Sequence, residues 1–207
     1  MNNGIELHGA HVRLEPLSKH HIAALVGASS GDPSFYTWSA VPQGEEQVRA
    51  YVEQALSLAA SGRAVPFATV RQRDGVVIGS TRFFDLERWP WPPERRARSD
   101  AAYDTCEIGY TWLAPAAIRT AANTEAKLLM LTHAFETWGV RAVTLHTDAR
   151  NARSRAAIER VGGQFEGILR SHRLAVDFIP RDSARYSILE SEWPAVKERL
   201  ARLLPSA

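Results

Sequence analysis

The segment 114–127, APAAIRTAANTEAK, joins a strand-like run to a helical run and contains residues suited to binding a phosphate. The run before it, CEIGYTWL, is rich in β-branched and aromatic residues, which predicts a strand over residues 106–113. A helix that begins directly after a strand presents unpaired N–H groups and the positive end of its dipole, and both attract anions. Arg119 and Lys127 add positive charge. The segment therefore predicts a phosphate site, although it contains no glycine.

The same segment also has a purely structural interpretation. Asn123 or Thr124 can cap the following helix, with Glu125 complementing the helix dipole.

Seven other arginines form two clusters, one on or near a later helix and one in a loop: Arg150, Arg153, Arg155 and Arg160, and Arg95, Arg96 and Arg98. Such clusters either bind phosphates or form a solvated surface, and the sequence leaves both interpretations open.

Length and composition restrict the class of protein. A chain of 207 residues is typical of one domain, and we predict a single domain over residues 1–207. The lone Cys106 excludes an internal disulfide and a cysteine-based metal site, which indicates a reducing compartment. We find neither a signal-peptide pattern nor an apolar stretch of membrane-spanning length, so we expect a cytoplasmic protein. The formal charge of +2 gives no indication of a nucleic-acid or membrane partner.

Strands and helices follow one another in a mixed order. Residues 5–17 alternate as a strand or a bent pair of strands, and Ser18 is placed to cap a short helix ending near Leu25. Asp74-Gly75 separates two strand-like runs, 65–72 and 76–86, and predicts an antiparallel hairpin. Helical spacing of apolar residues predicts helices over 45–60 and 127–139.

Further strands and helices are predicted in the second half of the chain. Residues 141–148 read as a strand, and a helix is expected from Asn151 to Gly162-Gly163. Strands over 164–176 and 184–189 precede a closing helix over 191–204. This order predicts an α+β fold, in which a mixed sheet carries helices on both faces.

The central motifs resemble those of the GNAT acetyltransferase superfamily, and within it the RimJ/RimL type, whose described members acetylate N-terminal amines of ribosomal proteins. The ordered segments are EIGYTWL, TEAKLLMLTHAFE, RAVTLHTD, NARSRAAIERVGG and FEGILRSH, and the resemblance covers about residues 65–200. Its most specific part is N-x-x-S-x-x-x-I-E-x-x-G-x-x-x-E-G-x-x-R, here Asn151, Ser154, Ile158, Glu159, Gly162, Glu166, Gly167 and Arg170.

The resemblance implies a twisted mixed sheet that splays open at the fourth core strand and holds acetyl-CoA as a cosubstrate, with no metal. It assigns coenzyme binding to Tyr110, Thr111, Trp112, Leu113, Ile118, Arg119, Thr120, Ala121, Ala122, Asn123, Thr124, Lys127, Asn151, Arg153, Ser154 and Arg160. The usual family loop reads Q/R-x-x-G-x-G/A, whereas this chain has Ile118, Ala121 and Asn123 at the aligned positions. Alanine is nearly as small as glycine, and asparagine tolerates the left-handed region, so we expect the loop to keep its shape.

The implied reaction is the direct attack of an amine on a thioester in a ternary complex. Glu107 is the first candidate for the general base and His172 the second, and Ser154 is the candidate acid that protonates the thiolate. Glu107 can instead form a strand-edge ion pair, and Ser154 can face solvent. Some RimL-type members carry a glutamate base where this chain has Arg173, so that role does not transfer. The other histidines show no ligand spacing, and His20-His21 is expected on an exposed helix.

Two classes of function remain beside an N-acetyltransferase acting on a peptide N-terminus or a small-molecule amine. One is a degenerate domain that binds coenzyme A or a partner without turnover, because the glycines are missing. The other is an RNA-associated module, suggested by Trp89 and Trp91 near the loop arginines and weakened by the prolines there. Acceptor specificity is expected from loops 31–43, 88–104 and 177–182, and a homodimer is possible.

Overall fold

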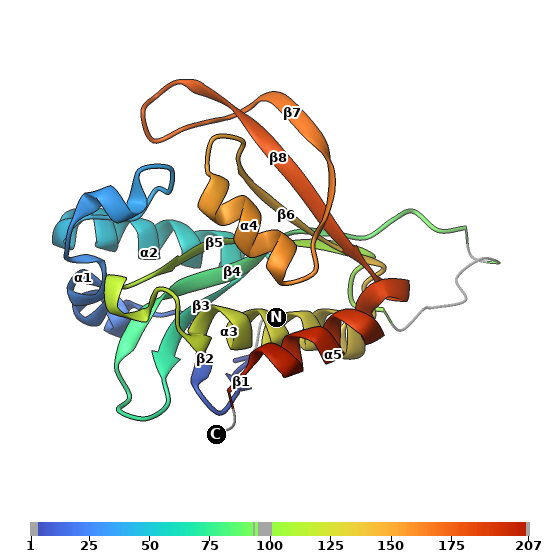
Figure 1. Ribbon diagram of the computed structural model, residues 1–207, viewed down its shortest axis with the longest axis horizontal. Helices are drawn as coiled ribbons and strands as arrows, with labels where there is room; N and C mark the ends of the chain where they lie inside the picture. Colours follow the sequence, from blue (N-terminus) through green and yellow to red (C-terminus); the bar gives the residue numbers. More distant parts are fainter. Residues whose placement is uncertain (1–3, 93, 95–100, 206–207) are drawn as a thin grey trace.

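The computed structural model describes residues 4–92, 94 and 101–205, and in this part of the chain eight strands form one sheet with five α-helices packed on it (Figure 1). The strands are β1 (Leu7–His8), β2 (Val12–Pro16), β3 (Ala64–Arg71), β4 (Val77–Glu87), β5 (Thr105–Leu113), β6 (Ala142–Asp148), β7 (Gln164–Leu174) and β8 (Pro180–Leu189). The helices are α1 (Ile22–Ser29), α2 (Gly44–Ala60), α3 (Ala121–Thr132), α4 (Ala152–Arg160) and α5 (Trp193–Leu203). The predicted loop cluster of Arg95, Arg96 and Arg98 lies outside the described residues.

The sheet is mixed, with the order β1-β2-β3-β4-β5-β6-β8-β7. Neighbouring strands are antiparallel except β5 and β6, which run parallel because the chain crosses between them through α3. The predicted Asp74-Gly75 hairpin is confirmed: β3 pairs with β4 from Ala64↔Phe84 to Val70↔Val77, and Gly75 takes the left-handed φ of 69° that its turn requires. The α+β prediction is therefore correct.

The two faces of the sheet carry separate cores. Along β3, Phe67 points into a core that contains α3 and α5, whereas its neighbour Ala68 points into a second core formed with α1 and α2. This alternation follows from the period of two in a strand. Helices therefore cover both faces, as expected from the sequence, and α3 and α5 lie side by side (Figure 1). Within the described residues we find no helix that is both long and apolar enough to cross a membrane.

A buried carboxylate fastens helix α3 to the β1–β2 edge of the sheet. Glu125 accepts hydrogen bonds from the backbone N–H groups of Ala10, His11 and Val12 at 2.9, 2.6 and 2.7 Å. Glycine is needed at position 9, because a Cβ there would lie 2.4 Å from the Glu125 carboxyl carbon. The sequence interpretation assigned Glu125 only a dipole role, but its main contacts are with the β1–β2 turn.

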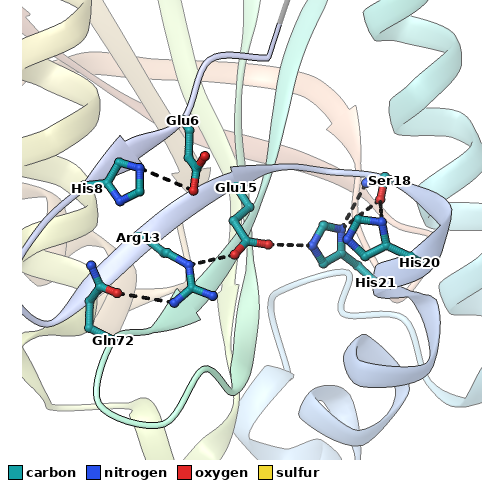
Figure 2. Close-up of polar contacts among 8 residues, drawn as sticks. All are labelled: Glu6, His8, Arg13, Glu15, Ser18, His20, His21 and Gln72. Carbon is teal, nitrogen blue, oxygen red and sulfur yellow. Dashed lines mark hydrogen bonds and ion pairs between the residues drawn. The ribbon is translucent and has the colours of Figure 1, made fainter.

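The expectation that His20-His21 lies on an exposed helix is wrong for His21. A short 3₁₀ turn, Lys19–His21, precedes α1, and the His21 side chain is buried below it. Figure 2 shows the reason: His21 Nδ1 accepts the Ser18 N–H at 3.1 Å, which leaves Nε2 to donate to Glu15 Oε2 at 3.1 Å. His20 is exposed and contacts the Ser18 hydroxyl at 2.6 Å. Hydrogen bonds within the protein thus engage this cluster, which joins β2 to α1.

Candidate active site

A cleft of about 750 Å³ lies where β5 separates from β6. The two strands pair only from Thr105↔Ala142 to Glu107↔Thr144, and the later residues of both strands line the cleft. This separation confirms the predicted splay at the fourth core strand, counting from β2. Backbone N–H and C=O groups along the parted edges can bind an extended ligand as a missing strand would.

A bulge in β5 aims that strand into the cleft. In the register with β4, Arg82 pairs with Gly109 and Ser80 with Trp112, so β5 has one residue more than its partner between these pairs. Tyr110 lies at this point with a φ of 51°, a strained conformation for a non-glycine residue. Strain of this kind is often found at functional sites, and here it turns the strand where the cleft opens.

The structure brings most of the predicted site residues to this one cleft. Those that line it are Glu107, Tyr110, Thr111, Trp112, Leu113, Ile118, Arg119, Thr120, Asn123, Lys127, Asn151, Arg153, Ser154 and Arg160. Four others, Ala121, Ala122, Thr124 and His172, do not form part of its lining. Ala122 is buried in the core under α3, and the Thr124 hydroxyl accepts a hydrogen bond from Arg160 Nη1 at 2.9 Å, which joins α3 to α4.

The glycine-free loop before α3 takes a different shape from the one expected. The left-handed residue is Arg119, with a φ of 63°, and Asn123 lies in the first turn of the helix. The cap is Thr120, whose Oγ1 accepts the N–H of Ala122 at 3.3 Å, so the prediction of a cap at Asn123 or Thr124 is wrong. Helix α3 accordingly starts at Ala121, several residues earlier than the apolar pattern predicted. Thr120 and Asn123 at the start of the helix still line the cleft, and a helix N-terminus in this position favours a phosphate.

Lys127 is buried beneath the cleft and does not reach out towards the loop. Its Nζ donates to Thr111 Oγ1 at 2.6 Å and to Thr81 Oγ1 at 3.4 Å, and the residue is 5% exposed. Burial lowers its pKa from 10.5 to about 7. This lysine therefore supports the floor of the cleft through the Thr111 side chain.

Helix α4 presents its first turn to the cleft. Asn151 caps the helix, since its Oδ1 accepts the N–H of Ser154 at 3.0 Å, as the sequence predicted. The Ser154 hydroxyl makes no hydrogen bond with the part of the chain that the structure describes, so it is available to a ligand. Arg153 donates to the carbonyl of Phe35, whereas Arg155 turns away to Tyr186 at 3.0 Å. The arginines of this cluster thus have separate structural partners.

Glu107 is the only carboxylate in the cleft lining of the described residues, and it is 3% exposed. Its Oε2 lies 3.2 Å from Arg173 Nη2, and its Oε1 lies 3.0 Å from His146 Nδ1. The His172 ring lies beside that of His146, with centroids 5.1 Å apart and the ring planes tilted by 40°. Burial, with a further effect from the charge of Arg173, lowers the pKa of His172 and favours its neutral form. Glu107 and His146 thus meet at one end of the cleft, and the half-buried His172 lies beside His146 outside the cleft lining.

Sequence reasoning did not identify several residues of the site. His146 lines the cleft from β6, and Tyr36 reaches it from the early loop, where its hydroxyl donates to the carbonyl of Leu113 at 2.9 Å. Tyr36 and Trp38 bring part of loop 31–43 into the lining of the cleft. Arg82 was also missed, although an arginine inside the apolar run VVIGSTRFFDL is a visible signal of a buried charge.

Several solved structures similar to this chain are described as acetyltransferases. A GCN5-related N-acetyltransferase from Brucella melitensis is 30% identical, with 97% of this chain and 86% of that chain covered and a TM-score of 0.81. A protein from T. thermophilus described as an acetyltransferase is 34% identical, with 97% of both chains covered and a TM-score of 0.76. RimJ of Mycobacterium smegmatis, solved in complex with CoA-disulfide, is 22% identical over 97% of this chain and 93% of its own, with a TM-score of 0.75, and shares the fold. The curated proteins gave no match to the sequence.

The sequence itself matches the acetyltransferase (GNAT) domain over residues 11–164. This match spans most of the chain and includes β5, the loop before α3, and the Asn151-Ser154 turn. Together with the split between β5 and β6, it shows that the chain belongs to the GNAT acetyltransferase family.

Proposed function

We propose that this protein is an N-acetyltransferase that transfers the acetyl group of acetyl-CoA to a primary amine, by direct attack in a ternary complex. The observation that carries the proposal is the cleft between β5 and β6, which has an open strand edge along its length and the first turns of α3 and α4 at its sides. An extended thioester arm fits such an edge, and a pyrophosphate fits the start of α3. Acetyl-CoA supplies the activated acetyl group when it is bound.

The residues of the cleft fit this cosubstrate. The open edge of β5 from Tyr110 to Leu113 offers backbone donors and acceptors, and the first turn of α3 with Arg119 offers a positive site for phosphate. Asn151 keeps its amide N–H groups for the arm, because only its Oδ1 is used by the cap. The loss of the family glycines is compensated by Arg119, which takes the left-handed conformation itself.

Proton transfers are assigned to the two sides of the cleft. Glu107, with His146 at 3.0 Å, accepts a proton from the acceptor ammonium, directly or through a water. The neutral amine nitrogen then forms a bond with the acetyl carbon while the carbon–sulfur bond breaks, and the nitrogen releases its extra proton through water, which restores the Ser154 hydroxyl after its proton transfer to sulfur. Ser154 lies on α4 across the cleft, and its hydroxyl donates a proton to the thiolate that leaves. His172 does not line the cleft, and we assign it to supporting His146.

The experiment measures coenzyme binding and turnover separately. Calorimetry with coenzyme A tests binding, and release of free thiol from acetyl-CoA tests transfer to a panel of peptides and small amines. Each amine is paired with its N-acetylated form, which cannot accept an acetyl group. We expect binding of coenzyme A and thiol release that requires the free amine. Binding without release from any amine supports a non-catalytic domain instead, and failure to bind coenzyme A contradicts both functions.

A further inference from the structure

The end of the cleft near Glu107 carries two arginines that face each other across a strand pair. Arg173 of β7 and Arg181 of β8 are directly opposite in the sheet register, and both line the cleft. Like charges at directly opposed positions destabilise an antiparallel pair. The arrangement therefore has a cost that a bound anion would remove.

The protein itself neutralises this pair only in part. Arg173 lies 3.2 Å from Glu107 and 3.6 Å from Asp85, which is exposed. Arg181 donates to the Ser183 hydroxyl at 3.1 Å and forms no ion pair with any residue that the structure describes. Burial and the charge of Arg173 lower the pKa of Arg181, and the carboxylates of Asp148 and Glu107, which are not ion-paired with it, offset this effect only in part. A half-buried guanidinium without a paired carboxylate is costly unless a ligand supplies one.

A third arginine adds to the positive potential. Arg82 is 0% exposed, and its guanidinium lies between the rings of Tyr51 and Tyr110, 4.8 and 4.0 Å from their centroids. None of its side-chain nitrogens has a hydrogen-bond partner among the described residues. Both rings line the cleft, and the cation–π contacts offset only part of the cost of burial. Its charge acts on the cleft through a medium of low dielectric constant.

Coenzyme phosphates are not the natural partners of these arginines. The phosphate-binding loop follows Leu113 at the far end of β5, whereas Arg173 contacts Glu107 near its beginning. Six residues of extended strand separate the two ends by roughly 20 Å. An anion at Arg173 and Arg181 would therefore belong to the other substrate.

We propose that the acceptor carries a carboxylate close to its amine, and that Arg173 and Arg181 bind this carboxylate. The inference rests on the proposed acetyltransferase function and names the substrate class of the same site. Glu107 next to Arg173 then receives the ammonium group, so the two charges of the acceptor meet opposite charges of the protein. Guanidinium groups bind carboxylates with a planar, two-bonded geometry, which fixes orientation as well as charge. The carboxylate can be that of a free amino acid or of an acidic residue near a peptide N-terminus.

The first test compares acceptors that differ only in this charge. The pairs are an α-amino acid with its amide, and the amidated dipeptides Ser-Asp and Ser-Asn. We expect kcat/KM to be roughly 10- to 100-fold higher for the acid of at least one pair, the gain typical of hydrogen bonds to charged groups. The pair that shows the preference identifies the source of the carboxylate. Equal use of acid and amide in both pairs would overturn the inference.

Variants of Arg181 connect the preference to the site. Arg181→Gln should reduce the preference to below about threefold, mainly through a higher KM for the acid. Arg181→Lys should retain part of it, because the charge remains. Arg185→Gln is the matched control, since Arg185 lies on the same strand, pairs with Glu166 at 2.6 Å and does not line the cleft. A similar effect of Arg181→Gln and Arg185→Gln would contradict the proposal.

A binding measurement makes the result independent of turnover. The N-acetylated acid and its amide are titrated into the protein with and without coenzyme A, and the wild type should bind the acid at least tenfold more tightly. Arg181→Gln should remove this difference while its affinity for coenzyme A stays within about twofold, which also shows that the variant is folded. Absence of coenzyme A binding would refute the proposed function. Coenzyme A binding together with equal affinity for acid and amide would refute this inference alone.

Discussion

Replacement of Lys127 by Met should change how the stability of the protein depends on pH. The lysine is buried under the cleft, and burial lowers its pKa from 10.5 to about 7. A shift of this size corresponds to about 5 kcal/mol of destabilisation when the group is protonated in both states, at about 1.4 kcal/mol per pKa unit. In Lys127→Met the Thr81 and Thr111 hydroxyls keep their mutual hydrogen bond at 2.7 Å, so the variant removes the charge without isolating its partners.

The direction of this pH dependence follows from the number of protons that the folded and unfolded states bind. The folded pKa lies below the unfolded one, so between pH 7 and 10.5 the unfolded state binds more protons and stability rises with pH. Below pH 7 the penalty is fully present. Between pH 7 and pH 9, the free energy of unfolding of the wild type should therefore rise by about 2 kcal/mol relative to that of the variant.

The assay is urea unfolding of the wild type and of Lys127→Met at pH 7 and pH 9, without coenzyme. Only the difference between the two proteins is interpreted, because other groups that titrate over this range are common to both. Lys19→Met is the control, since Lys19 is exposed and the change removes a lysine without removing a buried charge. The two proteins differ in their free energy of unfolding, and if this difference is the same at pH 7 and pH 9, the reasoning about this lysine is wrong.

Three further predictions concern the cleft and the turn that fastens α3. Ser154→Ala should lower kcat more than coenzyme A affinity, measured by thiol release and calorimetry, and unchanged kcat would exclude Ser154 as the proton donor. Arg119→Gly should raise stability by up to about 1 kcal/mol, because it relieves the φ of 63°, while coenzyme A affinity falls through loss of charge; a rise in affinity would contradict the phosphate role. Gly9→Ala should lower the free energy of unfolding in urea by about 3 kcal/mol, because the added Cβ would displace the Glu125 carboxylate from three N–H groups. The control is Gly27→Ala, which should not lower it, because no atom lies within 4 Å of the added Cβ.

The residues of the family signature have mainly structural contacts. Gly162 has a φ of 103°, and a Cβ there would lie 2.8 Å from the Val196 side chain, so glycine is needed where α4 ends against α5. Glu159 accepts a hydrogen bond from the Tyr186 hydroxyl at 3.1 Å, and Glu166 pairs with Arg185. The motif is specific to the fold because it describes how α4 and β7 pack, and only Asn151, Ser154 and Ile158 of it line the cleft.

The sequence by itself determined the features that depend on neighbouring residues. Alternation and helical spacing predicted the hairpin, the order of strands and helices, and the cap at Asn151, because these depend on contacts a few residues apart. The exact start of α3 was missed, since Thr120, Asn123 and Thr124 are all suitable caps and the path of the chain out of β5 selects Thr120.

Only the tertiary structure decided the composition of the site. Glu107 and Arg173 are 66 residues apart and meet because the β7–β8 hairpin reaches across the split between β5 and β6. Arg181 faces Arg173 because β7 and β8 pair in that register, and His146 lies close to Glu107 because β6 pairs with β5 just beside it. Strand register and the point where a sheet separates are fixed by packing of the whole core, which local spacing does not encode. For this protein the sequence therefore determined the fold and the residues that α3 and α4 bring to the cleft, and the tertiary structure determined which charged side chains meet at Glu107.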